Sequence, residues 1–325
     1  MEQSLVTSIL NHPPAEAWQI IISTLWNIFV DPIRKDLADA KTTERDRIVG
    51  EIDNLLAGAA WSLWQNVIDS PHKTSTQLRK FWKEENGGKA ILILDALSLR
   101  EACWILEEAG KRNFTIQMQR ATLSEIPGDT TPFAKVLGYN QRSSLANNSG
   151  KSNLFPDTYT ESVDIPFADC CSLIPPEPKV IFWHHWPDST IHDFANDGNG
   201  GQKLAKSVAD TLTGTEFWNF VERLATGRTL VITGDHGYAH AGLFRDLHNK
   251  DQAEYMKKLF KSGRSTVASI EEKHNWLPPL TYELNGHTLA MGRRKWKSPG
   301  GYPTLAHGGL SLLEVAVPFI KINKI

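Results

Sequence analysis

The run KAILILDAL at residues 89–97 constrains the fold more than any other feature, because after its first residue one carboxylate alone interrupts it. Strands of parallel sheets are buried on both faces and read as continuous apolar runs, so this run predicts a central strand. The capping-box residues Ser98 and Glu101 then predict a helix that extends to about Gly110. A strand followed at once by a helix is the repeating unit of an α/β sheet.

Strands and helices alternate along the rest of the chain. The runs FTIQMQRATL, PKVIFWHHW and RTLVITGDHG predict three more strands, and KLAKSVADTLTGTEFWNFVERLA predicts a single helix. HGGLSLLEVAVPFIKI predicts a short helix and a last strand. Residues 140–165 are largely polar and predict a surface insertion, and residues 241–300 show no single clear element. This order predicts a three-layer α/β sandwich with a mostly parallel central sheet.

Residues 1–87 differ from the rest and predict a helical N-terminal segment before a domain of residues 88–325. AEAWQIIISTLWNIF and DRIVGEIDNLLAGAAWSLWQNVI carry apolar residues at helical spacing. We expect the tryptophans of this segment to pack against the domain that follows. The segment contains no cluster of catalytic residue types.

The overall composition by itself excludes few classes of function. A formal net charge of −2 argues neither for nor against a nucleic-acid partner, because a local basic patch can suffice. Three cysteines without regular spacing form neither a disulfide framework nor a CxxC metal knuckle. The N-terminus lacks the pattern of a signal peptide, and no apolar run approaches the ~18 residues of a membrane span, so we expect a cytoplasmic location.

Six candidate metal ligands end predicted strands, follow one, or lie in a Gly-rich turn before one. They are Asp95, Asp188, His192, Asp235, His236 and His307. Ligands bind beyond the carboxyl ends of the strands in open α/β sheets, so we expect these side chains at one edge of the sheet. Taken singly, a strand-end Asp is more often a helix N-cap, and a lone His is usually a core or surface residue.

The joint pattern favours a metal site over these separate explanations. Asp188 and His192 are four residues apart and would share one face of a helix. Clustered carboxylates repel one another unless a cation lies between them. The mixture of carboxylate and imidazole ligands suits zinc, and manganese as well. We therefore expect up to two divalent cations.

A nucleophile candidate lies in PGDTTPFAKVLG at residues 127–138. Thr130 follows a Pro-Gly turn that can present its hydroxyl to solvent, and a cation can activate that hydroxyl for attack. Thr131 is the neighbouring competitor. The alternative explanation is structural, because a threonine here can cap the short helix TPFAKVL.

Two weaker features complete the candidates. Arg293 and Arg294 begin a basic run, RRKWK, that could guide a polyanionic substrate; a solvated charged turn explains the run equally well. His240, four residues after His236, is a further candidate ligand. Neither G-x-S-x-G nor a Walker P-loop occurs, which argues against a serine hydrolase and a P-loop ATPase.

Five segments resemble, in this order, those of PglZ-type domains in the alkaline phosphatase superfamily. They are ILILDAL, PGDTTPFAKVL, HHWPDSTIH, TGDHGY and HGGLSLLEVAVPF. The resemblance covers about residues 88–325, and TGDHGY followed by HGGLSLLEVAVP is its most specific pair. It implies an alkaline-phosphatase-like fold and a metal-dependent phosphodiesterase or phosphatase. PglZ-type domains are associated with phage exclusion and with response regulators, which implies protein partners in bacterial defence or signalling.

The resemblance also implies a ligand set and a mechanism. One cation would be held by Asp95, Thr130, Asp235 and His236, and the other by Asp188, His192 and His307. Thr130 would attack phosphorus in line, the leaving group would depart toward the second cation, and water would then hydrolyse the phosphothreonine. The spacing of Asp95 and Thr130 suits the nucleotide-phosphodiesterase branch, and hence a nucleotide or oligonucleotide substrate. Gly128 stands where family members commonly have Ser or Thr, which leaves the choice between Thr130 and Thr131 open.

Two other functions compete with this one. The chain could be a scaffold that keeps a metal site for stability and works by binding defence partners. All seven implied ligands are present, which favours the enzyme. A sulfatase is disfavoured, because the nucleophile segment has neither Cys nor the Cys-x-Pro-x-Arg pattern.

Overall fold

A six-stranded sheet lies at the centre of the computed structural model, which describes residues 3–84, 87–268, 276–298 and 300–324. The strand order is β2-β13-β5-β1-β4-β3. The strands are β1 (Gly88–Asp95), β2 (Phe114–Leu123), β3 (Tyr159–Val163), β4 (Lys179–Pro187), β5 (Arg228–Gly234) and β13 (Ala316–Lys324). β1 runs parallel to β4 and β5, and β3 to β4, whereas β13 is antiparallel to both of its neighbours. The predicted mostly parallel sheet is confirmed.

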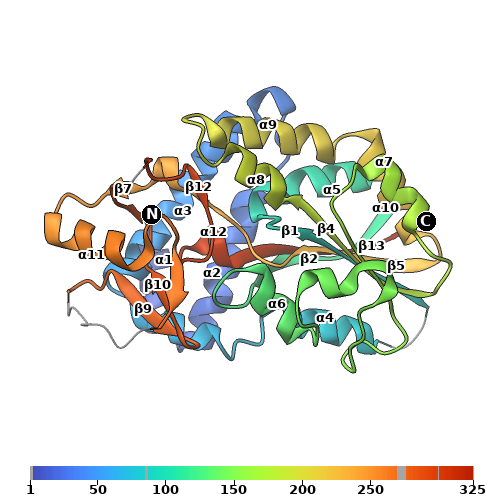
Figure 1. The fold of residues 1–325 in the computed structure, drawn as a ribbon, viewed down its shortest axis with the longest axis horizontal. Helices are drawn as coiled ribbons and strands as arrows, with labels where there is room; N and C mark the ends of the chain where they lie inside the picture. The colour runs from blue at the N-terminus through green and yellow to red at the C-terminus, as the bar shows by residue number, and fades with distance from the viewer. Residues whose placement is uncertain (1–2, 85–86, 269–275, 299, 325) are drawn as a thin grey trace.

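Helices cover both faces of this sheet and make a three-layer sandwich, as expected (Figure 1). In β1, Leu92 and Leu94 contribute to one hydrophobic core, and Ile91 and Ile93 contribute to the other. The helices that close the first core include α5 (Ala102–Lys111), α9 (Gly200–Leu212) and α10 (Thr215–Ala225). The second core is closed by α4 (Thr74–Lys83) and α6 (Thr130–Val136). Burial on both faces is the reason that β1 is an unbroken apolar run.

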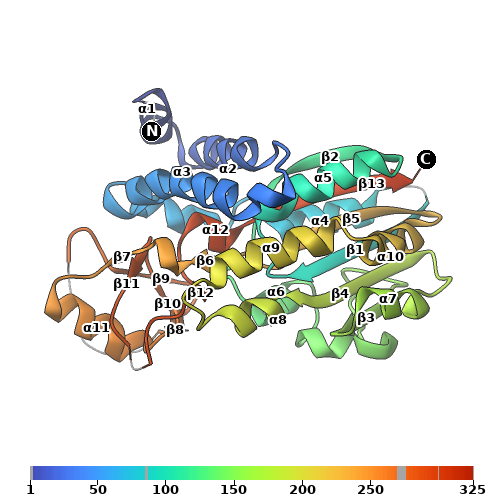
Figure 2. The ribbon, with the colours of Figure 1, turned by 90° about the horizontal axis from the view of Figure 1, so that it is seen from above.

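The N-terminal helices add to the first of these cores. They are α1 (Gln3–Asn11), α2 (Pro14–Phe29) and α3 (Ala38–Gly58), with 3-10 turns at η1 (Lys35–Leu37) and η2 (Trp61–Val67). Trp18, Trp26 and Trp64 are buried in the core cluster that also contains Leu92 and Leu94. Figure 2 shows α2 and α3 on the side of the molecule where β2 and α5 lie. The division of the chain at residue 87 stays a prediction.

The single helix predicted before β5 is two helices in the structure. α9 ends at Leu212 and α10 begins at Thr215. Gly214 between them has an extended backbone, with φ −78° and ψ 152°. Trp218 of α10 donates its indole N–H to the Leu212 carbonyl at 2.6 Å, so a side chain takes up one carbonyl at the end of α9.

The predicted surface insertion at residues 140–165 contains an edge strand of the sheet. The 3-10 helix η4 (Arg142–Asn148) is followed by β3, which pairs with β4. Thr160, Glu161 and Ser162 of β3 are all buried. Glu161 accepts hydrogen bonds from the backbone N–H groups of Asn147 and Ser162. β3 lacks an apolar run because the side chains that it buries are polar and form hydrogen bonds with neighbouring groups.

The described residues between 239 and 306 build small sheets beyond the end of the main sheet to which β1 points (Figure 2). Their strands are β6 (Ala239–His240), β7 (Arg245–Asp246), β8 (Ser265–Val267), β9 (Thr281–Leu284), β10 (His287–Ala290), β11 (Arg294–Lys295) and β12 (Leu305–Ala306). The helices here are η6 (Ala241–Leu243) and α11 (Lys250–Phe260). Met256, Phe260 and Trp296 belong to a separate small core in this region.

Short helical turns connect the main strands. They are η3 (Leu99–Glu101), α7 (Phe167–Cys170), η5 (Cys171–Leu173), α8 (Asp188–Phe194) and α12 (Leu312–Val315). Among the helices of the described residues, none has the length and apolar character needed to cross a membrane.

Candidate metal centre

The candidate ligands come together where the parallel strands end. Asp95 is the last residue of β1, and Asp235 and His236 directly follow β5. Asp188 begins α8 directly after β4, and His307 directly follows β12. Since β4, β1 and β5 are parallel neighbours, their carboxyl ends meet at one edge of the sheet.

The first group of ligand-type side chains is Asp95, Asp235 and His236, all fully buried. One candidate ligand atom from each lies within 4.8 Å of the other two. His236 Nε2 is 3.4 Å from Asp95 Oδ1 and 3.7 Å from Asp235 Oδ2. The other Asp235 oxygen accepts the Ala96 backbone N–H at 2.9 Å, which fixes the orientation of the carboxylate.

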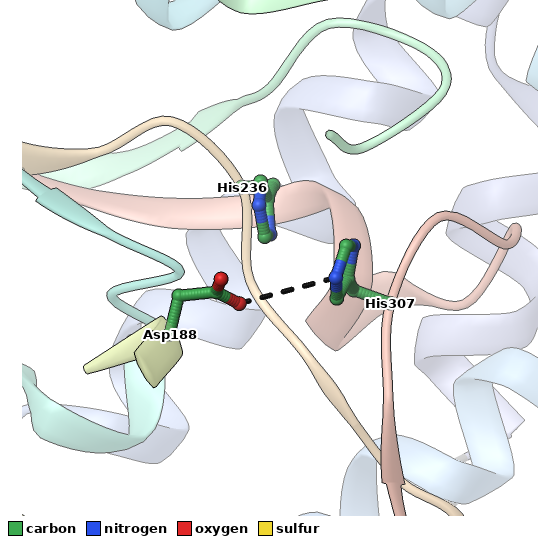
Figure 3. A group of neighbouring side chains, drawn as sticks. All are labelled: Asp188, His236 and His307. Atoms are coloured by element: carbon green, nitrogen blue, oxygen red, sulfur yellow. Dashed lines mark ion pairs between the residues drawn. The ribbon is translucent and has the colours of Figure 1, made fainter. Parts of the chain in front are cut away.

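The second group is Asp188, His236 and His307, so His236 belongs to both (Figure 3). His307 Nε2 lies 3.9 Å from Asp188 Oδ1. The rings of His236 and His307 are stacked with their centroids 4.5 Å apart. The sharing of one histidine places the two groups side by side.

Backbone carbonyls orient both histidines toward this space. His236 Nδ1 is 2.9 Å from the Gly237 carbonyl oxygen, and His307 Nδ1 is 3.3 Å from that of Gly128. A carbonyl can only accept, so each Nδ1 donates, and in the neutral ring Nε2 keeps its lone pair. Among the described residues, the buried atoms without a hydrogen-bond partner include Asp188 Oδ1, Asp235 Oδ2 and His236 Nε2. Buried oxygen and nitrogen atoms that lack a hydrogen-bond partner and lie close together are suitable ligands for a divalent cation.

Titration in this cluster reflects its crowded charges. Burial, together with the neighbouring Asp95 charge, raises the pKa of Asp235 to about 7. Burial lowers the pKa of His236, but the charges of Asp235 and Asp95 outweigh it and raise that pKa well above its usual value. Burial also raises the pKa of Asp188, yet the bond from His192 and the nearby His307 outweigh it and bring the pKa to about 2. Burial and the neighbouring His236 lower the pKa of His307.

Thr130 lies next to the first group. It is the first residue of α6, and its hydroxyl is 3.2 Å from each oxygen of the Asp95 carboxylate. Thr130 is half-buried, whereas Thr131 is exposed. The contact with Asp95 therefore distinguishes Thr130 from its neighbour.

Arg142 is a site residue that the sequence did not reveal. It begins η4, and its guanidinium pairs with Asp95 Oδ2. The polar stretch around it carries no motif, so no local signal marks it. A positive group thus lies against the same carboxylate that Thr130 contacts.

Two other histidines lie outside both groups. His192 Nε2 pairs with Asp188 Oδ2 at 3.3 Å, and its side chain is 64% exposed. His240 lies in β6, paired with Leu305 of β12, and close to Gly201 of α9.

Most of the basic run at residues 293–297 is buried or half-buried in the structure, and Lys297 alone of the five is exposed. The Arg293 side chain is 6% exposed, and its guanidinium pairs with Asp46 and Asp53 of α3. Arg294 is half-buried and donates from Nη1 to the Pro279 carbonyl at 2.8 Å. Since buried carboxylates engage Arg293 and a backbone carbonyl engages Arg294, the structure gives no support to their expected contact with substrate.

Comparisons with known proteins give no family assignment. No protein-family model matches the chain, and no curated protein matches its sequence. Solved structures that match include murine ectonucleotide pyrophosphatase/phosphodiesterase 5, in an inactive form in complex with AMP, with a TM-score of 0.43 and 12% identity over 73% of this chain and 88% of that chain. A second structure of that enzyme matches with a TM-score of 0.42 and 14% identity over 72% and 87%. Likenesses of this size carry no conclusion about the activity of this chain.

Proposed function

We propose that this chain is a metal-dependent phosphoester hydrolase with Thr130 as its nucleophile. The observation that carries the proposal is the place of the Thr130 hydroxyl, 3.2 Å from both oxygens of Asp95. Around it lie two overlapping groups of carboxylates and imidazoles that contain buried atoms without a hydrogen-bond partner. A hydroxyl beside such ligands is the arrangement that nucleophilic catalysis at phosphorus needs.

The proposed ligands follow the two groups. Asp95, Asp235 and His236, with Thr130, would hold one cation, and Asp188 and His307 would hold the other, joined by His192 after a small movement of its exposed side chain. Zinc and manganese both suit this donor set. Such cations, when bound, favour the ionised form of a hydroxyl and offset the negative charge of a phosphate.

The chain's own side chains orient the reaction. Asp95 accepts the Thr130 hydroxyl proton as a hydrogen bond, so the lone pairs of that oxygen face away from Asp95, where a phosphorus atom can approach. Arg142 pairs with the same Asp95 carboxylate that Thr130 contacts, and we assign it to the phosphate oxygens of the substrate, which an arginine can bind through two parallel N–H groups.

The substrate and setting follow from the resemblance to PglZ-type domains. We propose a phosphodiester of nucleotide or oligonucleotide type, and a cytoplasmic role in bacterial phage exclusion or signalling with protein partners. The basic run at residues 293–297 no longer supports a diester, because the structure buries Arg293. The spacing between Asp95 and Thr130 is the remaining support.

The test is a turnover assay of the full chain after loading with zinc or manganese. Bis-p-nitrophenyl phosphate and short oligonucleotides probe diesterase activity, and p-nitrophenyl phosphate probes monoesterase activity. We expect turnover that a chelator abolishes and that Asp235→Ala lacks. A loaded chain that is inert toward every substrate would contradict the hydrolase and favour the scaffold.

A further inference from the structure

Helix α3 carries two buried aspartates that are hydrogen-bonded to Arg100, Arg293 and the Leu312 backbone. Asp46 and Asp53 are seven residues apart, which is about two turns, so they lie on the same face of the helix. Each is 1% exposed. Both belong to the N-terminal helices, which carry none of the proposed ligands.

Asp46 is connected to the loop that carries His236. Its carboxylate accepts Arg100 Nε at 2.9 Å, and Arg100 donates from Nη1 to the Tyr238 carbonyl at 2.8 Å. The Arg100 guanidinium also lies 4.4 Å from the centre of the Tyr238 ring. Tyr238 is two residues after His236, so the path from α3 to the ligand passes through a single arginine.

Asp53 is connected to the segment that carries His307. Its Oδ1 accepts the Leu312 backbone N–H at 2.8 Å, and its Oδ2 accepts Arg293 Nε at 2.6 Å. Leu312 begins α12, five residues after His307. The turn between them is closed by Glu314 of α12, whose Oε1 accepts the Gly309 N–H at 2.8 Å.

Helix α12 also contacts the His236 loop directly. The Gly237 backbone N–H donates to the Glu314 carbonyl at 2.9 Å. A Cβ at Gly237 would collide with the Leu313 carbonyl, so the two backbones pack without a side chain between them. The two ligand segments and α3 therefore form one hydrogen-bonded unit.

We propose that Asp46 and Asp53 are positioning residues, which hold the His236 and His307 segments at the separation that metal binding requires. This role rests on the proposed function. A buried ion pair is weak evidence for stability, because apolar side chains of similar volume often serve as well. Fixed ligand geometry is what a metal site gains from such partners, and their loss weakens metal binding.

Titration calorimetry of the full chain with zinc separates positioning from stability. In Asp53→Asn we expect roughly tenfold weaker zinc binding, in line with the loss of groups that orient metal ligands. The double variant Asp53→Leu/Arg293→Met removes both charges of this ion pair together and leaves Asp46 paired with Arg100. It avoids a buried unpaired charge, so it can fold even if Asp53→Asn does not. We expect the same weakening in this double variant.

Arg228→Met is the matched control. Arg228 is buried at the start of β5, the end away from the ligands, and donates to the carbonyls of Glu177, Leu224 and Pro175. Its loss should lower stability and leave zinc affinity unchanged. Amide hydrogen exchange in the metal-free chain gives a second measurement, and we expect faster exchange at residues 307–312 in the Asp53 variants but not in the control.

The outcomes distinguish the two proposals. Wild-type zinc affinity and wild-type exchange in the folded Asp53 variants would overturn the positioning role and leave the hydrolase intact. A wild-type chain that binds neither zinc nor manganese would overturn the proposed function, and the exchange at residues 307–312 would then decide the positioning role.

Discussion

Asp95 is the residue at which the parts of the candidate site meet. The Thr130 hydroxyl, the Arg142 guanidinium and the His236 ring all contact its carboxylate, which is fully buried. A substitution of Asp95 would disturb all of these contacts together. Thr130 and Arg142 instead each offer a change at the edge of the cluster, so their roles can be measured separately.

Thr130→Ala tests the nucleophile. We expect turnover to fall by several powers of ten, because the covalent step loses its attacking oxygen. Zinc should still bind, since Asp95, Asp235 and His236 remain. The measurement is steady-state turnover at a temperature where circular dichroism shows the variant to be folded.

The controls for Thr130 are its own conservative variant and its neighbour. Thr130→Ser keeps the oxygen and should keep substantial activity, and Thr131→Ala should do little because Thr131 is exposed. The structure makes Asp129, not Thr130, the N-cap of α6, so a purely structural Thr130 would contribute only its contact with Asp95, and its loss would lower stability and leave the rate intact. Near wild-type turnover in folded Thr130→Ala would remove it from the mechanism.

Arg142→Gln tests phosphate binding. A hydrogen bond to a charged group contributes about 1.5–3 kcal/mol, so we expect kcat/KM to fall by roughly 10- to 100-fold. Zinc affinity should not fall, because Arg142 supplies no ligand atom. Lys151→Gln, at an exposed lysine nine residues further on, is the control. Equal kinetics in both variants would leave Arg142 with a structural contact only.

The residues of the site were predictable where a general rule of the fold places them. Asp95 ends a parallel strand, Asp188 and Asp235 directly follow two others, and such strands end at one edge. Arg142 could not be found this way, because it reaches Asp95 from an irregular segment whose path depends on the pairing of β3. Arg293 looked solvated because its partner Asp53 lies 240 positions away in the sequence.

At the scale of single elements, the turn η3 shows how a local signal can have a distant partner. Ser98 and Glu101 form the predicted capping box, with the Ser98 N–H donating to Glu101 Oε2 at 2.7 Å. Glu101 also accepts the Tyr238 hydroxyl at 2.8 Å. Burial raises the pKa of Glu101 to about 7, and the positive charge of the neighbouring Arg100 offsets only part of this rise.

Glu101→Gln should therefore change the pH dependence of stability. A carboxyl whose pKa is raised in the folded state stabilises the protein below its unfolded pKa, and this contribution is lost as pH rises through the folded pKa. From the shift of Glu101 from 4.5 to about 7, we expect wild-type stability to fall by on the order of 3 kcal/mol across that range relative to the variant. Urea unfolding at several pH values measures this difference. Parallel pH profiles for the two proteins would contradict it.

Elements with a strong apolar pattern were predictable, and those defined by their partners were not. β1, β4 and β5 are central strands, and their runs of apolar residues predict strands that are buried on both faces. β3 is an edge strand with polar buried residues, so only its pairing with β4 identifies it. The break at Gly214 was missed because helical spacing continues on both sides of it.

At the scale of the whole molecule, metal binding should couple to stability. A ligand that binds only the folded state at 100 times its dissociation constant adds about 2.7 kcal/mol, and a chain of 325 residues gains roughly 1.5 °C in Tm per kcal/mol. We therefore expect zinc or manganese to raise Tm by about 4 °C, and a chelator to reverse the rise. Asp235→Ala is the control. An equal rise in this variant would show that the ion binds elsewhere.

The antiparallel strand β13 carries a consequence for how the chain is made. It lies between β2 and β5, so β2 joins the sheet only through β13. Leu123 of β2 pairs with Ala316, and more than half of the chain separates the two. At a synthesis rate of ~5–20 residues per second, the ribosome needs on the order of 10–40 s to cover that distance. Throughout this interval β2 is an edge without its neighbour, open to pairing with other nascent chains.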